Sequence, residues 1–373
     1  MKKVIVSVIN DLSTDQRVHK TCNTIHALGY DVLLIGRKQR KSQSLLPRRY
    51  KVKRMSLFFE KGMLFYAEYQ IRLFLYLLFH RSDILVSNDL DTLLPNYLVS
   101  KLKKKTIVYD THELFCEVPE LQHRPLKKKI WKSIERRIFP KLKYVFTVND
   151  SIAAIYKEEY HIPVRVVKNV PLLSNQTDFT KKTKQQLGIP EDKKIILLQG
   201  AGINVNRGAE EAVEAMQYVD NALLLIIGGG DVIELLKHLT VELNLNNKVL
   251  FIGKIPFQEL RQYTQHADIG LTLDKGTNLN YKYSLPNKLF DYIHAGVPVL
   301  SSDLPEIKKI ITRYDIGDYI DQHDPEHIAK KICTMLREEV ILQVWKKNTK
   351  IAAENLNWEK EERQLIDVYK QFL

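Results

Sequence analysis

The chain has 373 residues, of which 45% are hydrophobic and 27% are charged, and its formal net charge is +13. This composition excludes a disordered, collagen-like or repeat-dominated chain, and at roughly 150 residues per domain the length favours two globular domains. The three cysteines, Cys22, Cys116 and Cys333, lie far apart, which excludes a disulfide framework and a cysteine zinc site and favours a reducing cytoplasm.

The apolar segments are too short for export or for crossing a membrane. Asp11 and Asp15 follow the first apolar run, where a signal peptide would have its cleavage site. The most lipid-like segment, residues 71–79, is far below the roughly 20 apolar residues that span a bilayer. We therefore expect a soluble protein of the cytoplasm.

Short runs rich in β-branched residues alternate with helical patterns along the chain. The expected strands are residues 3–9, 31–35, 84–86, 106–109, 144–148 and 164–167 in the first half, and 194–198, 222–227, 249–252, 269–273 and 298–301 in the second. Because these runs are apolar almost throughout, they are typical of strands covered on both faces of a parallel sheet. The sequence predicts an α/β fold with two doubly wound parallel-sheet domains.

The predicted domains are residues 1–170 and 171–357, with a polar linker at 172–184 and a terminal amphipathic helix at 358–373. Tandem domains of this kind place a ligand cleft at the carboxyl ends of their strands. Residues 1–170 carry 32 Lys and Arg against 16 Asp and Glu, whereas residues 171–373 carry 25 against 28. A basic first half favours phosphate-bearing partners, such as anionic lipid, a lipid-linked phosphate or nucleic acid.

A helix and its flanks at 282–300 form the most informative segment. Pro286 suits the first helical turn, and the helix start near Asn287, with the charge of Lys288, predicts an anion site. Asp291, one turn further, offers the hydrogen-bond acceptor that a ribose diol needs. The alternative is a capped amphipathic helix whose lysine and aspartate are only solvated.

A glycine-punctuated loop at 199–208 follows a predicted strand and opens a helix at Arg207. Such a loop brings the backbone, Gly202 included, close to a diphosphate, while Arg207 supplies charge and a bidentate fork. It lacks the G-x-x-x-x-G-K-[ST] pattern, so it is no P-loop. The glycines at 228–230 are better explained by a tight turn between strand and helix.

In the first half, Asp110, His112 and Glu113 stand at the exit of a predicted strand, where they suit binding or proton transfer. The alternative is that Asp110 caps a turn and His112 is incidental.

The first loop between strand and helix holds Asp15 and Arg17. Ser13 and Gln16 fit a capping box there, and Arg17 either reaches the cleft or pairs with Asp15 or Glu113. His and carboxylate residues do not cluster at ligand spacing, so we expect no metal.

Residues 37–81 are basic and aromatic, and 101–105 and 127–137 extend the positive charge. Cations beside exposed aromatic rings suit a protein that rests on an anionic membrane face. The alternative is a core helix beside a solvated basic loop. No nucleic-acid-binding module is recognisable, so nucleic acid is not expected as a partner.

Segments 286–300 and 251–260 resemble the GT-B glycosyltransferases, specifically glycosyltransferase family 4, and the resemblance covers essentially the whole chain. It is supported by the loop at 200–208 and by residues 144–151. The terminal helix is similar to the one that crosses back onto the first domain in this fold.

The resemblance implies a nucleotide-sugar donor on the second domain and an acceptor on the first. Arg207 matches the basic residue on the donor diphosphate, and Asp291 matches the second acid of the family's E-x7-E pair, which grips the ribose. His112 matches a histidine near the donor sugar. The backbone at Asn287, Lys288 and Leu289 matches the amides on the diphosphate, and Gly253, Lys254, Ile255 and Pro256 match the stretch beside the base.

The chain departs from the family pattern at two positions. The first acid of the pair falls at Tyr283, and the family's other donor-loop arginine falls at Ala201. Neither residue can make the expected contact, so the resemblance leaves the donor sugar open and weakens the retaining assignment.

The resemblance implies transfer of a sugar from a UDP- or GDP-linked donor to a saccharide or lipid-linked acceptor, in cell-surface polysaccharide or glycolipid synthesis. Arg207 and Lys288 would stabilise the leaving diphosphate without an obligatory metal or other cofactor, in a retaining reaction. In an inverting reaction Glu113, His112 or Asp15 is the candidate base. The alternatives are a silent GT-B scaffold, a nucleotide-sugar epimerase and, least favoured, a dehydrogenase. The expected location is the cytoplasm, with a peripheral contact to the inner membrane face.

Overall fold

The computed structural model describes residues 1–13, 15–40, 42, 44–173 and 181–373, and the chain divides into two compact units. Unit 1 consists of Met1–Asn169 and Trp358–Leu373, and unit 2 of Val170–Asn357. This division lies one residue from the predicted boundary. Part of the predicted linker, residues 174–180, lies outside the described residues.

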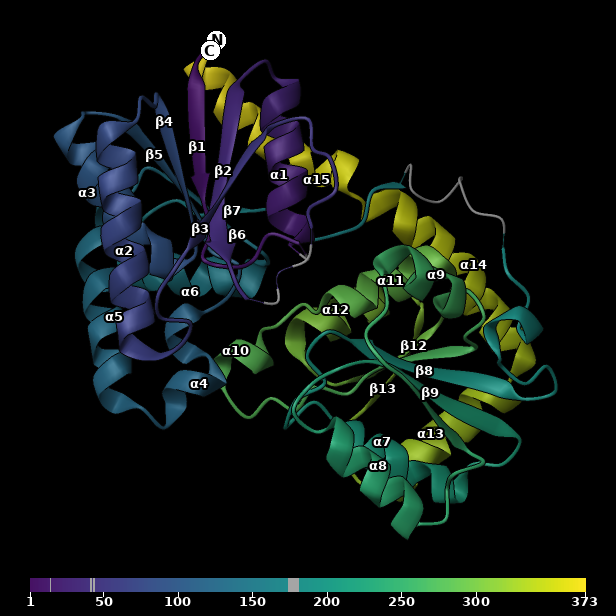
Figure 1. Cartoon of the computed structure of the whole chain (residues 1–373). Coiled ribbons are helices and arrows are strands. Elements are labelled where there is room, and N and C mark those ends of the chain that lie inside the picture. Colours follow the sequence, from purple (N-terminus) through teal and green to yellow (C-terminus); the bar gives the residue numbers. More distant parts are fainter. Residues whose placement is uncertain (14, 41, 43, 174–180) are drawn as a thin grey trace. The chain divides into compact units, whose positions relative to one another are not determined.

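Unit 1 is built on a parallel sheet in the order β3-β2-β1-β4-β5-β6-β7 (Figure 1). Its strands are β1 (Lys3–Ser7), β2 (Asp31–Lys38), β3 (Lys51–Ser56), β4 (Ile84–Asn88), β5 (Thr106–Asp110), β6 (Tyr144–Thr147) and β7 (Arg165–Val166). The central strands are buried along most of their length, since helices cover both faces of the sheet.

The helices of unit 1 form two layers. They are α1 (Gln16–Ala27), α2 (Gly62–Phe79), α3 (Leu90–Leu102), α4 (Pro119–Gln122), α5 (Pro125–Ile138), α6 (Asp150–Tyr160) and α15 (Trp358–Tyr369). Helices α2 and α3 lie on one side of the sheet, and α1 and α15 on the other (Figure 1). On the first side, Tyr69, Leu73 and Leu77 of α2 pack on apolar residues of the sheet.

The terminal helix α15 is part of unit 1 because its buried face packs on α1. The indole nitrogen of Trp358 donates to the hydroxyl of Thr24 over 3.1 Å, and that hydroxyl donates to Glu362 over 2.6 Å. The hydroxyl of Tyr30 donates to the carbonyl of Tyr369 over 2.6 Å. The last residues of the chain therefore complete the core of the unit that the first residues begin.

Unit 2 is built on a second parallel sheet, in the order β10-β9-β8-β11-β12-β13. Its strands are β8 (Lys194–Gly200), β9 (Ala222–Gly228), β10 (Val249–Ile252), β11 (Ile269–Thr272), β12 (Val299–Ser302) and β13 (Gly317–Ile320). Its helices are α7 (Ala209–Ala215), α8 (Ile233–Glu242), α9 (Phe257–Thr264), α10 (Leu279–Lys282), α11 (Asn287–Ala295), α12 (Pro305–Tyr314), α13 (Pro325–Arg337) and α14 (Glu339–Asn355).

Each face of the second sheet has its own hydrophobic core. Helices α7, α8 and α13 cover one face, and α9, α11, α12 and α14 cover the other (Figure 1). Two parallel sheets with helices on both faces confirm the predicted doubly wound α/β fold.

The sequence prediction missed the edge strands β3 and β13. Strand β3 carries charged side chains at exposed positions in alternation with less exposed ones, so it lacks the continuous apolar run of a central strand. Strand β13 has only four residues, and one of them is fully buried. An edge strand has one neighbour and tolerates charge, which explains why an apolar pattern does not reveal it.

Two predicted helix starts are also corrected. Asp15, not Ser13, caps α1, where its carboxylate accepts from the backbone N–H of Val18 over 2.9 Å. Helix α7 begins at Ala209 rather than at Arg207, and Gly208 is its cap, with φ of 69°. Among the described residues, no helix combines the length and the apolar character needed to cross a bilayer.

Candidate functional site

The carboxyl ends of β8 and β11 mark a switch point in unit 2. These strands are neighbours in the sheet, yet the chain leaves β8 toward β9 and β10 and returns to place β11 on the other side. Ligands of doubly wound folds bind where the strand order reverses in this way. The loop of residues 201–208 follows β8, and Asp274 stands two residues beyond β11.

Arg207 and Lys288 converge on Asp274. The guanidinium of Arg207 lies 3.0 Å from one carboxylate oxygen, and the ammonium of Lys288 lies 3.7 Å from the other. Asp274 is fully buried, whereas the side chains of Arg207 and Lys288 are 27% and 11% exposed. Two cations on one buried anion leave one net positive charge that faces outward, which suits a diphosphate.

The electrostatics of the three groups are coupled. Burial by itself lowers the pKa of Lys288, and the repulsion of Arg207 adds to this, so that the pKa stays below its usual value although Asp274 opposes both effects. Burial also disfavours the charge of Arg207, but there Asp274 outweighs it and the pKa is raised. Lys288 therefore gains most from a bound anion, since a further negative charge favours its protonated form.

Arg207 has hydrogen-bonding capacity to spare. Its guanidinium carbon lies 4.6 Å from the ring centre of Tyr281, on which it stacks. In the described part of the chain its buried Nε has no hydrogen-bond partner. Gly208 sets the direction of the loop, because its φ is positive and a Cβ there would lie 2.3 Å from the carbonyl oxygen of Leu273.

Helix α11 presents Lys288 and Asp291 as the sequence predicts. Pro286 precedes the helix as its cap and Gly296 ends it in the left-handed conformation, with φ of 79°. Leu289 is fully buried in the core, and its backbone N–H donates to the carbonyl of Pro286 over 3.1 Å, so the expected contact of this amide to a ligand is corrected. The first helical turn orients the backbone N–H groups of Asn287 and Lys288 toward the helix start, where anions are favoured.

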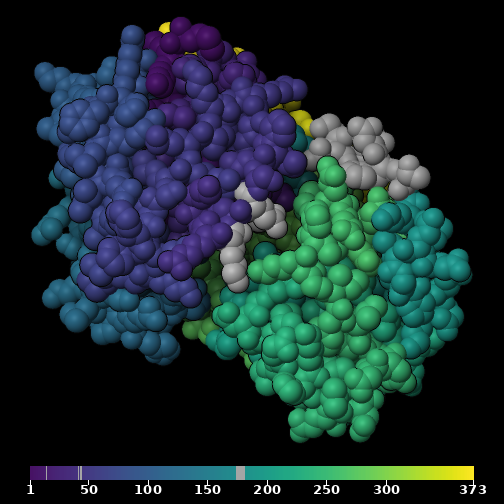
Figure 2. Space-filling view, in the orientation of Figure 1, coloured from purple at the N-terminus to yellow at the C-terminus, as the bar shows by residue number. Residues whose placement is uncertain are grey.

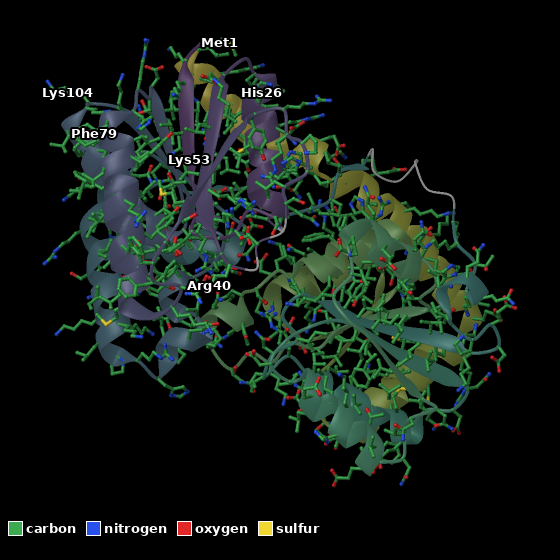
Figure 3. All side chains as sticks on the ribbon, in the orientation of Figure 1. Met1, His26, Arg40, Lys53, Phe79 and Lys104 are labelled. Carbon is green, nitrogen blue, oxygen red and sulfur yellow. The ribbon has the colours of Figure 1, made fainter. Side chains whose placement is uncertain are left out.

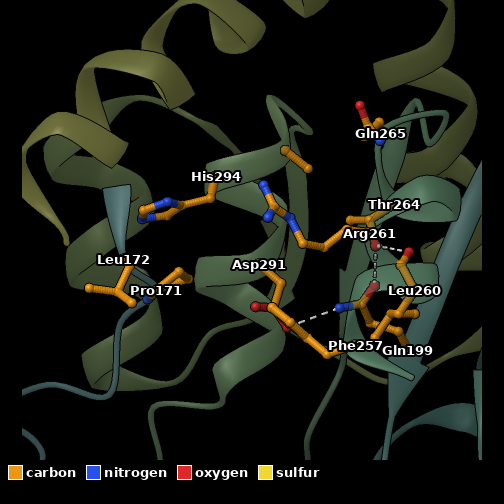
Figure 4. A pocket seen from close by; sticks show the side chains of 11 residues that line it. Pro171, Leu172, Gln199, Phe257, Leu260, Arg261, Thr264, Gln265, Asp291 and His294 are labelled. Atoms are coloured by element: carbon orange, nitrogen blue, oxygen red, sulfur yellow. Dashed lines mark hydrogen bonds between the residues drawn. The ribbon is translucent and has the colours of Figure 1, made fainter. Parts of the chain in front are cut away.

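Asp291 lines a pocket of about 190 Å³ between α9 and α11 (Figure 4). The amide nitrogen of Gln199 donates to its carboxylate over 3.1 Å. Phe257 and Arg261 of α9 line the same pocket, and burial lowers the pKa of Arg261. A half-buried carboxylate beside apolar and cationic groups can accept hydrogen bonds from sugar hydroxyls.

The remaining positions expected near the donor lie on connecting loops of unit 2. Gly253, Lys254, Ile255 and Pro256 link β10 to α9, where Pro256 caps the helix. The aliphatic part of Lys254 lies over Gly229, where an added Cβ would meet its Cε at 2.5 Å. Gly202 is exposed in the loop after β8, as is Ala201. Tyr283, at the position of the missing acid, ends α10.

In unit 1, Arg17 is not available to an acceptor. It is 3% exposed and forms a two-pronged ion pair with Asp110, over 3.1 Å and 2.7 Å. Its remaining nitrogen donates to the carbonyl of Val167 over 2.6 Å. The prediction that Arg17 reaches a ligand or pairs with Asp15 or Glu113 is corrected, because Asp110 takes its charge.

His112 lies between two carboxylates. Its Nδ1 is 3.2 Å from Asp89 and its Nε2 is 3.5 Å from Asp110. Burial alone would lower the pKa of His112, but the two carboxylates outweigh it and hold the pKa well above its usual value. Burial would likewise raise the pKa of Asp110, yet Arg17 and His112 hold it well below its usual range. His112 is not incidental, because the two carboxylates favour its protonated form.

The other acceptor-side candidates have structural partners. The carboxylate of Asp15 accepts from the backbone of Val18 and from the side-chain amide of Asn10. Glu113 is half-buried, and its backbone carbonyl accepts from the hydroxyls of Thr111 and Tyr156. Within the described residues, no group of three or more His, Cys, Asp or Glu side chains is arranged to hold a metal ion.

Asp274 and Gln199 are the site residues that sequence reasoning missed. Each follows or ends an apolar strand, Gln199 as the penultimate residue of β8 and Asp274 two residues after β11. Polar residues at the carboxyl ends of buried strands are the available signal. A search for polar residues directly after each predicted strand would have identified both Gln199 and Asp274.

These features define a two-domain α/β protein of the GT-B architecture, and the comparison with family models agrees. Residues 179–352 match the model described as glycosyl transferases group 1, and residues 15–170 match the model described as glycosyltransferase family 4. The chain belongs to this family of GT-B glycosyltransferases, which confirms the resemblance seen in the sequence.

Individual relatives are distant. A glycosyltransferase of Methanocaldococcus jannaschii is 25% identical over 194 residues, which cover 50% of this chain and 47% of the relative. The chain spans about half the length of the curated relatives it matches. Sucrose-phosphate synthase from Thermosynechococcus elongatus has the same fold, with a TM-score of 0.83 at 16% identity over 100% of this chain and 99% of that chain. HepE of Anabaena, solved with UDP-glucose, has a TM-score of 0.77 at 14% identity over the whole of both chains.

Proposed function

We propose that the chain transfers a sugar from a nucleoside-diphosphate sugar to a saccharide or lipid-linked acceptor. The observation that carries this proposal is the convergence of Arg207 and Lys288 on the buried Asp274 at the switch point of unit 2. Membership of the glycosyltransferase family and the likeness to HepE, which was solved with UDP-glucose, support a nucleotide sugar as donor.

The cation pair acts on the leaving group. When the bond between the anomeric carbon and the diphosphate breaks, the electron pair stays on the phosphate oxygen, and Arg207 and Lys288 stabilise the negative charge that forms there. A protein-supplied positive charge takes the place that a divalent cation has in other transferases, so we propose a reaction without an obligatory metal or other cofactor.

We propose a retaining reaction, in which the departing phosphate takes the acceptor's proton as the acceptor oxygen bonds to the anomeric carbon. The raised pKa of His112 between Asp89 and Asp110 disfavours it as a general base, and the carboxylate of Asp15 is engaged by the backbone of Val18 and the side chain of Asn10, so we do not propose an inverting route through either group. The positive charge of His112 instead suits a contact to a donor-sugar hydroxyl or to the leaving group.

A thermal-shift screen with UDP and GDP tests the donor proposal. One of them is expected to raise the apparent Tm of the wild-type protein by mass action. Arg207→Gln is expected to abolish that rise and to slow sugar transfer about 10²-fold, by analogy with the loss of one transition-state donor. Arg313→Gln, at an exposed position of α12, is the matched control. No stabilisation by either nucleotide, or full stabilisation of Arg207→Gln, would refute the proposal.

We also propose that unit 1 rests on an anionic membrane surface, where a lipid-linked acceptor lies in polysaccharide or glycolipid synthesis. Helix α2 exposes an apolar stripe at every fourth residue: Met63, Ala67, Ile71, Leu75 and Phe79. Ile71 is 60% exposed and Phe79 is 78% exposed. Figure 2 shows atoms in the blue-violet colour range of this part of the chain at the surface of unit 1. An unpartnered apolar stripe of this length marks an interaction surface.

Lysine and arginine side chains flank this apolar stripe. Phe79 and Lys104 lie at the same end of unit 1 (Figure 3), where Lys103 donates to the carbonyl of Leu77 over 3.0 Å. Arg72 lies 5.0 Å from the ring centre of Phe58, which is 82% exposed. Exposed apolar side chains beside lysine and arginine are complementary to an anionic lipid surface, which offers both apolar tails and negative headgroups.

Co-sedimentation with vesicles tests the membrane contact. Wild-type protein is expected to bind vesicles that contain phosphatidylglycerol, and not pure phosphatidylcholine vesicles. The double variant Ile71→Asn/Phe79→Asn is expected to lose most of the binding. The control double variant Leu235→Asn/Val241→Asn changes two exposed residues of α8 in unit 2. Equal binding of the two double variants would contradict the assignment.

A further inference from the structure

Gln199 is a buried amide of unit 2 that contacts a residue of the proposed donor site. It is 2% exposed at the carboxyl end of β8, and its amide nitrogen donates to Asp291 over 3.1 Å (Figure 4). Its amide oxygen lies 2.8 Å from the hydroxyl of Thr264 on α9. A chain of contacts thus runs from α9 through the strand to Asp291 on α11.

The charge of Asp291 fixes the orientation of the amide. If the amide were reversed, its oxygen would face the carboxylate and the two acceptors would repel each other. Thr264, which is 2% exposed, keeps the observed orientation because its hydroxyl can donate to Gln199. The same hydroxyl lies 2.9 Å from the carbonyl of Leu260, one turn earlier in α9, so its single hydrogen is shared between this carbonyl and the amide oxygen of Gln199.

Asp291 needs such support. The family resemblance expects a glutamate at this position, and aspartate is shorter by one methylene group. The partner acid of the pair is replaced by Tyr283, so Asp291 is the remaining acid of that motif. A hydrogen bond to one carboxylate oxygen fixes the plane of the carboxylate and therefore the direction of its other lone pairs.

We propose that Thr264 and Gln199 are positioning residues that hold the Asp291 carboxylate in place for a vicinal diol, the ribose hydroxyls of the donor nucleotide. The inference rests on the proposed donor function and on the expected ribose contact of Asp291, and it adds the two residues that position its carboxylate. Gln199 does not touch the substrate, so its loss acts through the direction and charge of Asp291.

The decisive experiment compares a ribonucleoside diphosphate with its 2′-deoxy counterpart, using UDP or GDP, whichever stabilises the wild-type protein. We expect the wild type to bind the ribonucleotide about 10-fold more tightly, the effect of one hydrogen bond to a charged group. Gln199→Met is expected to lose this preference while its affinity for the deoxynucleotide stays unchanged. Thr264→Val is expected to reduce the preference in part, and it serves as the second variant if Gln199→Met does not fold.

A charge variant gives an independent readout. Gln199→Glu places a second carboxylate beside Asp291, and their repulsion raises the pKa at which one of the two takes up a proton that both then share. Its affinity for the ribonucleotide is expected to fall about 10-fold at pH 8 and to recover toward pH 5, where the shared proton restores a donor. Arg261 from α9, and Tyr292 and His294 from α11, are the other titratable groups around Asp291, and all three are present in every variant.

Gln217→Glu, at an exposed position, is the matched control and is expected to behave as wild type. An unchanged preference for ribose in Gln199→Met and Thr264→Val, or an affinity of Gln199→Glu without pH dependence, would overturn the inference. If neither UDP nor GDP bound the wild-type protein, the donor function itself would fail and the inference with it. The two failures can be told apart, because a failure of the donor function is already seen in the wild-type protein, whereas a failure of the inference is seen only in the variants.

Discussion

Arg17 of unit 1 and Arg207 of unit 2 each pair with a buried aspartate near the carboxyl end of a parallel strand, but they differ in what remains free to bind a ligand. Arg17 is 3% exposed, and its three nitrogens all donate within the fold. Arg207 is 27% exposed, and its guanidinium holds one carboxylate oxygen of Asp274 while part of the side chain stays open to solvent. A saturated arginine holds a fold together, whereas an unsaturated one is available to an anion.

The comparison predicts its largest effect on stability at Arg17. Arg17→Met would leave Asp110 buried with only His112 nearby, and breaking a buried pair in this way costs about 3–5 kcal/mol. Arg207→Met should cost no more than about 1–2 kcal/mol, because Lys288 still faces Asp274. Chemical denaturation of both variants measures the difference. Equal losses of unfolding free energy in the two variants would show that the number of hydrogen bonds each arginine makes within the fold does not distinguish their roles.

A smaller effect is expected at the cap of α7. In Gly208→Ala the new methyl group would meet the carbonyl of Leu273, and the backbone would be held at φ of 69°. We expect a loss of about 2 kcal/mol in the free energy of unfolding, together with weaker nucleotide binding because Arg207 is displaced. In the same loop, Gly202→Ala meets its nearest atom at 3.5 Å and should change stability by less than about 0.5 kcal/mol. Similar Tm values for the two variants would contradict this.

The free energy of unfolding is expected to depend on pH through the charged cluster of His112 and Asp110 in unit 1. The pKa of His112 is raised in the folded state, so its contribution is complete below the ordinary histidine pKa of about 6.5 and is lost as the pH rises through the folded value. The pKa of Asp110 is lowered, so its contribution is present above about 3.9 and is lost on acidification. The difference in unfolding free energy between wild type and His112→Gln should therefore shrink in alkaline solution. A difference that stays constant from pH 6 upward would show that His112 is neutral in the fold.

The smallest expected effect concerns Lys288. Because its pKa is lowered, the lysine loses its charge at a lower pH than an ordinary lysine does. The affinity for UDP or GDP is expected to fall as the pH rises toward the alkaline range, and Lys288→Arg should flatten this dependence because arginine stays charged. Calorimetric titrations at several pH values provide the measurement. Parallel pH profiles for the two proteins would assign the dependence to another group.

The sequence predicted the parts of the fold that depend on local pattern. Apolar runs located the central strands, and Pro286 and Gly296 delimited α11, because turn and cap chemistry is local. The sequence did not reveal strand β3, because its charged side chains suit an edge strand and interrupt the apolar pattern. The partner of Arg17 escaped because Asp110 lies 93 residues away and becomes its neighbour only through the order of the strands.

The same limit applies to the site. Arg207, Lys288 and Asp291 were found because each belongs to a motif with a recognisable spacing. Asp274 and Gln199 are single polar residues, and their importance follows from the adjacency of β8 and β11 and from the packing of α9 near α11. Strand order is a property of the whole sheet, and one sequence without relatives does not specify it.

The place of α15 in unit 1 has a consequence for biosynthesis. Residues 358–373 are translated only after unit 2, so the face of α1 that Trp358 covers stays open while unit 2 is translated. At roughly 5–20 residues per second, that interval lasts about 10–40 seconds. This face of α1 therefore stays exposed in the nascent chain throughout that period. A chaperone that shields it would raise the yield of folded protein.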